Sequence, residues 1–472
     1  MLALSIILVM TQRANQIANL EAFLQGHPTI KYISPSSENY ANAYKGWNGS
    51  RRDNPLSIVQ PQSHTDVCTL IKYLKSNSLP FTLRAGGHNL EGRAVVDGAL
   101  LIDLRLLTGV TIAPDRKSAV IQGGTLQDEV GNTLWKDGLG TATGSIPSVG
   151  YVGWATYGGY GPFSSHWGLG ADQIISATVV NPDGDIYIAD RDLLQGVRGA
   201  GGLFGVILEV TVKVYPLSTL LAGPIVFDST DIKKTFIDFN AAYQQLETEG
   251  IPTELTVQQT IFNGPHGAAF AIQFVWSGEN LEDGQNWSEK IAALGPVSMN
   301  GVIPTNLPDW FAGIGAHIPR TAYGSPYSHN VSSLSPTVAE IIGNGIAEMP
   351  NNPGTMMSIH QLRGKALQCE LPSVFEAREP HFMLEIIGFS TDSALLSEAE
   401  KWAAGIADNL IKVALNAVLP THYISVFNSV AQASSPAEWV EKTYGTKVDT
   451  LKRLKTKFDP ENLFALTVPT LR

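Results

Sequence analysis

Residues 81–89 read Phe-Thr-Leu-Arg-Ala-Gly-Gly-His-Asn and combine a cation, an imidazole and two unhindered backbone positions. The first three residues are typical of a strand, after which Gly86 and Gly87 let the backbone turn tightly and expose its amides. Such amides attract an anion, to which Arg84 would add a full charge, and His88 would project beside the bound group. The segment predicts an anion-binding loop; a surface turn carrying a solvated histidine is the alternative.

A second glycine-rich segment, residues 143–161, reads Thr-Gly-Ser-Ile-Pro-Ser-Val-Gly-Tyr-Val-Gly-Trp-Ala-Thr-Tyr-Gly-Gly-Tyr-Gly. So many glycines among aromatic side chains argue against a regular helix. They favour backbone that packs closely against a flat ligand. This second segment shifts the balance toward a binding site for an anionic, partly aromatic molecule.

A single carboxylate, Glu385, interrupts the apolar segment 381–388, which reads His-Phe-Met-Leu-Glu-Ile-Ile-Gly. A carboxylate is costly to bury unless it is paired, and desolvation would raise its pKa toward the range of a working general base. The alternative is that this face of a predicted strand meets water. Glu385 is therefore a candidate base whose role depends on what the strand faces.

The order of these motifs resembles a known family. R-x-G-G-H at 84–88, G-x-x-P-x-V-G at 144–150, G-G-Y-G at 158–161 and G-L-x-x-D at 168–172 follow one another, and residues 198–206 and 458–464 continue the match. This set resembles the berberine-bridge-enzyme-like flavoproteins of the vanillyl-alcohol oxidase superfamily. The resemblance implies an α+β fold, with a PCMH-type FAD-binding domain of two subdomains and an α+β substrate domain built on an antiparallel sheet.

The resemblance implies FAD as the cofactor and assigns contacts to it. The family's histidine that bonds covalently to the flavin falls on His88, and the position of a second, cysteine tether falls on Ile146, so a single link is expected. Val149 falls where a small side chain accompanies oxidase behaviour, although it could equally be a core residue. The expected FAD contacts are Arg84, Gly86, Gly87, His88, Asn89, Thr143, Gly144, Val149, Gly150, Gly153, Thr156, Gly158, Gly159 and Ile207.

The family's catalytic positions fall on Glu385, as the base, and on Tyr160, as a hydrogen-bonding partner of the substrate; Tyr423 is a third candidate. Many relatives read Tyr-x-Asn-Tyr where this chain reads Tyr423-Ile-Ser-Val, which makes a sugar substrate less expected. The resemblance implies an oxidase of a small alcohol or amine of specialised metabolism, with dioxygen as the second substrate and hydrogen peroxide as a product. A flavoprotein cyclase or a non-catalytic binding protein are the alternatives.

Composition restricts the partners. The chain has 472 residues, 44% of them hydrophobic, and a net charge of -11, which argues against a nucleic acid or an anionic membrane as partner. The apolar run 2–10 is too short to span a membrane. Cys68 and Cys369 form no disulfide framework and no metal motif, which favours the cytoplasm, whereas the sequons at Asn48, Asn286 and Asn330 would matter only in a secreted protein.

Hydrophobic periodicity predicts the elements that position these residues. We expect four regions: an N-terminal helical segment (1–50), the FAD-binding domain (51–217), the substrate domain (218–425) and a C-terminal segment (426–472) that by resemblance returns to the FAD domain. Expected helices cover 15–25, a capping-box helix from Ser63, 126–135, 231–246, 286–294, 393–410 and a last helix around 448–458. Expected strands cover 81–83, 100–104, 119–122, 175–180, 185–189, 206–215, 255–262, 268–276 and 381–389, with a loop-rich stretch between 295 and 353.

Overall fold

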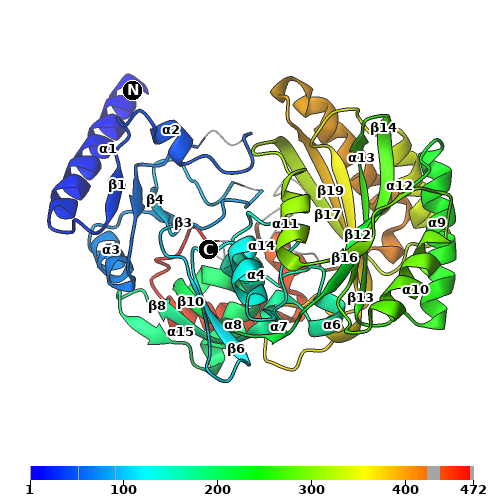
Figure 1. The fold of residues 1–472 in the computed structure, drawn as a ribbon. Coiled ribbons are helices and arrows are strands. Elements are labelled where there is room, and N and C mark those ends of the chain that lie inside the picture. Colours follow the sequence, from blue (N-terminus) through cyan, green and yellow to red (C-terminus); the bar gives the residue numbers. More distant parts are fainter. Residues whose placement is uncertain (1, 51–52, 91, 422–435, 468–472) are drawn as a thin grey trace.

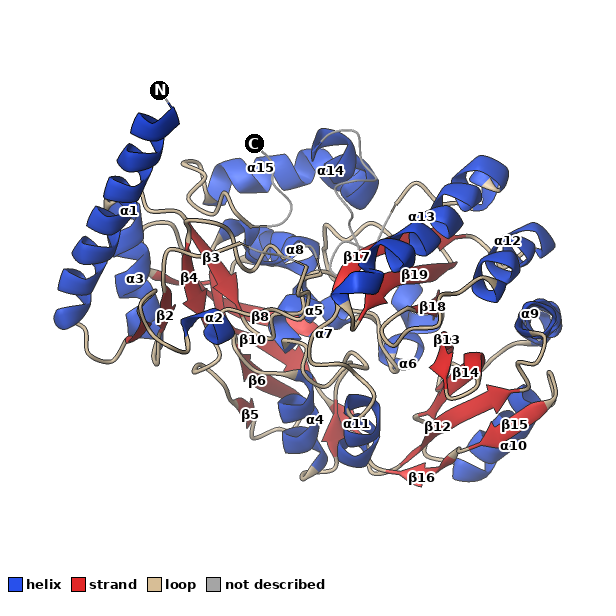
Figure 2. Ribbon diagram, turned by 90° about the horizontal axis from the view of Figure 1, so that it is seen from above, coloured by secondary structure: helices blue, strands red, loops and turns tan. Residues whose placement is uncertain are grey.

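The computed structural model describes residues 2–50, 53–90, 92–421 and 436–467. Three sheets of four or more strands organise this part of the chain (Figure 1). Two of them lie side by side in the half that contains the N-terminus, and the largest lies in the other half. Seen from above in Figure 2, the segment around α5 (Tyr151–Thr156) and α7 (Gly170–Gln173) lies between the two halves.

The first sheet has the order β1-β2-β4-β3, in which β4 is parallel to both β2 and β3. Helices α1 and α3 cover it with apolar side chains such as Leu20 and Leu70. Helix α3 begins with the predicted capping box, since the Ser63 hydroxyl accepts from the Asp66 amide and the Asp66 carboxylate accepts from the Ser63 amide. The elements are α1 (Leu2–Gln25), β1 (Lys31–Ile33), α2 (Tyr40–Ala43), β2 (Ile58–Gln60), α3 (His64–Ser76), β3 (Phe81–Arg84) and β4 (Leu100–Asp103).

The second sheet is antiparallel, with the order β5-β6-β10-β8-β9. The predicted hairpin between β8 and β9 is present, and Gly184 in its turn has a φ of +76°. Strand β10 joins two cores, because Val206 and Leu208 pack under the first sheet whereas Ile207 and Val210 pack under the second. The strands are β5 (Val110–Ile112), β6 (Ser118–Gln122), β8 (Ile174–Val180), β9 (Ile186–Ile188) and β10 (Val206–Lys213); β7 (Leu139–Gly140) pairs with β11 (Tyr215–Pro216).

Helices from two distant parts of the chain complete the core of the second sheet. Trp439 and Tyr444 of α14 and Leu451 of α15, near the C-terminus, are buried in the same cluster as Val130 of α4 and Val197 of α8. The helices around this sheet are α4 (Gln127–Trp135), α5, α6 (Ser164–Trp167), α7, α8 (Arg191–Ala200), η1 (Gly201–Phe204), α14 (Pro436–Tyr444), η6 (Gly445–Lys447) and α15 (Val448–Phe458).

The third sheet has eight antiparallel strands in the order β15-β12-β14-β13-β18-β19-β17, with β16 also paired to β12. Helices α9, α10, α12 and α13 pack on the face away from the first two sheets (Figure 1). The strands are β12 (Leu220–Phe227), β13 (Leu255–Gly264), β14 (Gly267–Trp276), β15 (Val297–Asn300), β16 (Ile303–Thr305), β17 (Tyr323–Val331), β18 (Met356–Leu362) and β19 (His381–Ser390). The helices are α9 (Ile232–Glu249), α10 (Leu281–Ala292), α11 (Leu307–Gly315), α12 (Pro336–Ala347), η2 (Gly364–Leu367), η3 (Ser393–Leu395), α13 (Leu396–Val413) and η4 (Leu415–Ala417).

Successive side chains of β19 point to opposite faces of the third sheet, and this decides which of them face the site. Phe382, Leu384 and Ile386 lie in the core beneath the helices. Met383 instead packs with Tyr160 from the glycine-rich segment, so the intervening residues of the strand face the first two sheets. Glu385 is the one residue of β19 that is not fully buried.

Three sequence-based expectations differ from the structure. The stretch 295–353 was expected to be loop-rich, but it forms β15, β16, α11, β17 and α12, whose short or polar repeats carry a weak periodic signal. Helix α1 begins at Leu2 rather than at residue 15, and β1 follows it. The short helix α5 forms inside the glycine-rich segment, because burial of Tyr151 and Trp154 compensates for the low helix propensity of glycine.

In the part of the chain that the structure describes, no helix is both long enough and apolar enough to cross a membrane.

Candidate active site

Arg84, the last residue of β3, forms a buried ion pair. Its guanidinium is buried, with Nη2 at 2.7 Å from Oδ2 of Asp103 in the neighbouring strand β4 and at 2.6 Å from the carbonyl oxygen of Ala43. A buried cation requires such a partner because desolvation is costly. Arg84 therefore fixes the start of the loop through Asp103, whereas its buried Nε has no hydrogen-bond partner within the described residues, and the expected contact with an anion stays a prediction.

Gly86 and Gly150 bring the two glycine-rich segments into backbone contact. A Cβ atom on Gly86 would lie 2.4 Å from the amide nitrogen of Gly150 and 2.6 Å from the carbonyl oxygen of Ser148. A Cβ atom on Gly150 would lie 2.8 Å from that of Ala85. No side chain fits at these distances, so glycine is required at 86 and 150 by the approach of the two backbones.

His88 lies on the other side of this contact and is partly buried. Its Nε2 is 2.8 Å from Oγ of Ser148, and its ring stacks on that of Trp47 at a centroid distance of 6.1 Å. Burial lowers the pKa of His88 to about 4. The imidazole is therefore neutral at neutral pH, which is the form that can act as a nucleophile.

The segment 143–161 folds back on itself and leaves one face open. A Cβ atom on Gly161 would lie 1.8 Å from the carbonyl oxygen of Thr143, so the two ends of the segment touch. Gly153, by contrast, is exposed on an otherwise buried helix, and a Cβ atom there would meet no protein atom within 4 Å. Within the described ranges, the buried Oγ1 of Thr143 has no hydrogen-bond partner. This open glycine face and unused hydroxyl fit a flat cofactor with polar edges.

The other expected cofactor contacts lie in the same half of the protein, but two of their side chains are already engaged. Oδ1 of Asn89 accepts from the amide of Arg93 at 3.0 Å, and Oγ1 of Thr156 donates to the carbonyl of Val152 at 2.7 Å. Thr156 would therefore meet a cofactor mainly through its backbone, whereas the side chain of Asn89 could still donate through Nδ2. The remaining expected contacts, all buried or partly buried, are Gly87, Gly144, Val149, Gly158, Gly159 and Ile207.

Glu385 meets a polar cluster on the inner face of the third sheet. Its Oε2 lies 3.3 Å from Nε2 of His360, and both side chains are about nine-tenths buried, with 13% and 14% exposure. Nε2 of His360 also lies 3.1 Å from Oγ of Ser358 and 3.2 Å from Nε2 of Gln258. Three polar groups, those of Glu385, Ser358 and Gln258, thus converge on Nε2 of His360.

Tyr160 is held by a neighbouring buried histidine. Its hydroxyl lies 2.8 Å from Nε2 of His381, whose Nδ1 lies 2.6 Å from the carbonyl oxygen of Glu379. Burial lowers the pKa of His381 to about 4, so the ring is neutral. A carbonyl can only accept, so Nδ1 carries the ring proton and the Tyr160 hydroxyl must donate to Nε2. The hydroxyl proton of Tyr160 is therefore directed at His381.

Sequence reasoning identified Glu385 and Tyr160 but missed the residues that hold them. His360 and Ser358 are two apart in β18 and therefore share a face, a signal that the alternation of residues 356–362 contained. Gln258 belongs to β13, and nothing in the sequence joins that strand to β18. Tyr423 lies outside the described residues, so the structure does not place it.

Comparison with known proteins gives this fold and site a family. Residues 55–190 match the model for an FAD binding domain, and residues 408–468 match the berberine and berberine-like model. The FAD-linked oxidoreductase aurO of Gibberella zeae is 29% identical over 93% of this chain and 85% of its own length. (R)-6-hydroxynicotine oxidase of Paenarthrobacter nicotinovorans is 37% identical over 40% of this chain and 43% of its own. Berberine bridge enzyme from Eschscholzia californica shares the fold, with a TM-score of 0.80, 17% identity and coverage of 96% and 99%.

The fold and the glycine-lined site define an FAD-linked oxidoreductase with a PCMH-type cofactor domain. The chain belongs to the berberine-bridge-enzyme-like family of these flavoproteins. The expected α+β fold, with an antiparallel sheet in the second half, is confirmed.

Proposed function

We propose that the protein is an FAD-dependent oxidase of a small organic alcohol or amine of specialised metabolism. The observation that carries this proposal is the pairing of Glu385 with His360 on a sheet face that turns toward the glycine-rich segments. When bound, FAD supplies the acceptor for a hydride and passes the electrons to dioxygen, with hydrogen peroxide as the product.

Glu385 is the proposed general base for the substrate hydroxyl or amine. Its carboxylate is nearly buried, in a strand whose other residues are fully buried, and its nearest polar partner is His360. Ser358 and Gln258 limit the movement of that imidazole, so that the carboxylate keeps one orientation. Tyr160 lies beside the same cluster, where its oxygen can accept a hydrogen bond and position the substrate.

His88 is the proposed site of a single covalent bond to FAD. Ser148 occupies Nε2, which leaves Nδ1 for the bond, and the low pKa keeps the ring unprotonated. Ile146 is a hydrocarbon and offers no second nucleophile. Acid precipitation tests this assignment. The yellow colour should stay with the wild-type protein and leave it in His88→Ala, and peptide mapping should find one flavin-bearing peptide.

Val149 is the proposed residue on the path of dioxygen to the cofactor. It is partly buried and packs at the edge of the core under the second sheet, directly after Ser148. A side chain of this size leaves more space than a bulkier one would, which favours reaction with dioxygen. Val149→Leu should slow the reoxidation of the reduced enzyme and leave its reduction by substrate unchanged.

The experiment that tests the base is rapid mixing of Glu385→Gln with substrate in the absence of dioxygen. Glutamine keeps nearly the same volume but does not accept the proton, so cofactor reduction should slow by roughly 100- to 10,000-fold. More substrate should not restore the rate, because binding was not removed. Glu379→Gln is the control, since that side chain is exposed and lies two residues before the same strand. Equal rates in the two variants would remove Glu385 from the mechanism.

We also propose a function for each of three segments of the chain. Residues 51–217 would bind FAD, residues 218–425 would supply the substrate face, and residues 426–472 would return to the cofactor half. The burial of Trp439, Tyr444 and Leu451 beside Val130 supports the last assignment. Removal of the C-terminal segment should therefore abolish flavin binding rather than alter substrate choice.

A reducing compartment such as the cytoplasm is the proposed location. Cys68 and Cys369 are both free thiols. Two sequon asparagines are buried, with Nδ2 of Asn48 donating to the carbonyl of Leu90 at 2.6 Å and Nδ2 of Asn330 donating to that of Thr421 at 2.9 Å. Glycosylation at either site would break these bonds. Fractionation of the producing cells tests the location.

A further inference from the structure

Strands β13 and β18 are paired along only part of their length. The ladder runs from Phe262 opposite Met356 to Gln259 opposite Ile359. Continued in the same register, it would place Val257 opposite Gln361. Those residues belong to the two strands, yet no backbone pairing joins them in the described chain. The strands therefore part at this end, and we call the opening between them the β13–β18 slot.

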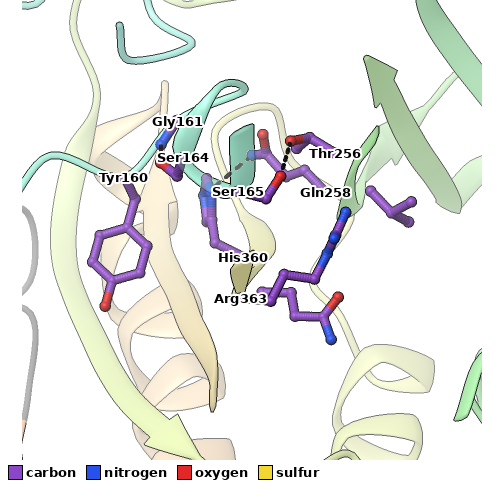
Figure 3. A pocket seen from close by; sticks show the side chains of 10 residues that line it. Tyr160, Gly161, Ser164, Ser165, Thr256, Gln258, His360 and Arg363 are labelled. Atoms are coloured by element: carbon purple, nitrogen blue, oxygen red, sulfur yellow. Dashed lines mark hydrogen bonds between the residues drawn. The ribbon is translucent and has the colours of Figure 1, made fainter. Parts of the chain in front are cut away.

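A small cavity lies in the slot: about 20 Å³ is accessible to the centre of a water-sized molecule, within about 340 Å³ of empty space that includes the part open to solvent. Figure 3 shows Tyr160 and Arg363 on opposite sides of the view, with His360 between them. Tyr160 and His360 are the groups that hold the candidate catalytic cluster, so the slot extends the active site. The cavity is lined by Tyr160, Gly161, Ser164, Ser165, Thr256, Val257, Gln258, His360, Gln361 and Arg363.

Among the described residues that line the cavity, Arg363 is the one with a permanent positive charge. Nη1 donates to the carbonyl oxygens of Ile251 at 3.2 Å and Pro252 at 3.0 Å, and Nη2 donates to that of Leu255. Among the described residues, no carboxylate lies within 4.0 Å of this guanidinium. Glu247 and Glu254 act on it only at longer range.

Three of the five N–H groups of Arg363 are thus used by carbonyls. Nε–H and one N–H of Nη2 have no hydrogen-bond partner among the described residues. In a guanidinium, Nε and one terminal nitrogen form an edge that a carboxylate can meet with both oxygens. Two of the lining hydroxyls already donate elsewhere, since Thr256 donates to the carbonyl of Pro162 at 2.7 Å and Ser165 donates to that of Thr253 at 2.7 Å. The slot therefore offers unused donors and a positive charge at its Arg363 end.

We propose that the β13–β18 slot binds a carboxylate of the substrate through Arg363, while the oxidisable carbon lies beside Tyr160 and Glu385. The substrate is then a small organic acid that also carries the alcohol or amine. This inference rests on the proposed function for the oxidation itself, but the binding of the carboxylate requires no turnover.

The test is calorimetric titration of the flavin-loaded enzyme with benzoate and with benzamide, which have the same shape and differ in charge. A charge-assisted, two-point contact should make benzoate bind roughly 10- to 100-fold more tightly than benzamide. Arg363→Gln should remove that preference, whereas Lys365→Gln, which removes a charge two residues away on an exposed side chain, should retain it. Equal binding of the two probes to the wild-type enzyme would overturn the proposal.

A further variant keeps the outcome clear. Arg363 also holds three carbonyls, so Arg363→Lys preserves the charge if the glutamine variant does not fold. The lysine variant should lose much of the preference, because an ammonium lacks the planar pair of donors, and an unchanged preference would contradict the two-point contact. Benzoate and benzamide are bound without turnover, so the comparison does not require Glu385 to act as a base. The oxidase proposal can thus fail while the binding of benzoate is confirmed. The binding proposal can also fail while the oxidase activity is confirmed.

Discussion

Replacement of Gly153 by alanine separates the cofactor role of α5 from its structural role. Gly153 is exposed, a Cβ atom there would meet no protein atom within 4 Å, and its φ is not in the left-handed region. Inside a helix, alanine is favoured over glycine by about 0.5–1 kcal/mol. For the protein by itself, Gly153→Ala should therefore be neutral or stabilising.

With FAD present, the expected effect has the opposite sign. If the open face of α5 is where the cofactor packs, the added methyl group meets FAD, and overpacking of a close contact costs about 1–3 kcal/mol. That cost corresponds to a loss of roughly 5- to 150-fold in the binding constant. The fraction of purified protein that carries flavin should fall, as measured by visible absorption against protein concentration.

Gly405→Ala is the matched control, because Gly405 is also exposed, lies inside the long helix α13 and has no protein atom within 4 Å of its Cβ position. This variant should raise the melting temperature and leave the flavin content unchanged. If Gly153→Ala loads flavin as fully as Gly405→Ala, the open face of α5 does not contact the cofactor, and the placement of FAD along residues 143–161 is wrong.

Three further predictions concern Asp103 and His360, which hold the site, and His329, a buried residue of β17. Asp103→Ala should destabilise the protein by about 3–5 kcal/mol in denaturant unfolding, because it leaves the buried Arg84 cation unpaired; a loss below about 1 kcal/mol would mean that water reaches the cation. His360→Asn should lower turnover by about 10- to 100-fold and change its pH profile while flavin content stays constant, since it removes the partner of Glu385; an unaltered profile would make His360 structural only. Burial lowers the pKa of His329 from 6.5 to about 4, so between these pH values the unfolded chain binds a proton that the folded chain does not. The free energy of unfolding should therefore fall as the pH drops from about 6.5 toward 4. The fall should be less steep in His329→Gln.

The local elements were largely predictable from sequence because their signals are short-range. The capping box at Ser63 and the hairpin turn that ends at Gly184 each lie within four consecutive residues. The apolar repeat of α13 marks the face that packs on the third sheet, as expected. The order of the glycine motifs indicated the family, and the family implied FAD as the cofactor.

Which side chains meet was decided by tertiary structure. The sequence indicates that Arg84 is a cation beside a glycine turn, but only the parallel pairing of β3 with β4 places Asp103 against it. The contact between Gly86 and Gly150 likewise depends on two loops from different subdomains. Glu385 could have faced water or the core until the third sheet placed one face under its helices and the other toward Tyr160.

The β13–β18 slot shows the same limit most clearly. Each strand has an ordinary β sequence, and nothing in either one indicates that the ladder stops after Gln259 and Ile359. Register and separation depend on how the whole sheet packs against its helices, which is a sum over many distant contacts. The sequence by itself therefore determined the elements, the family and the candidate base, whereas the partners of that base and the shape of the cavity beside it arise only when strands far apart in the chain are brought together.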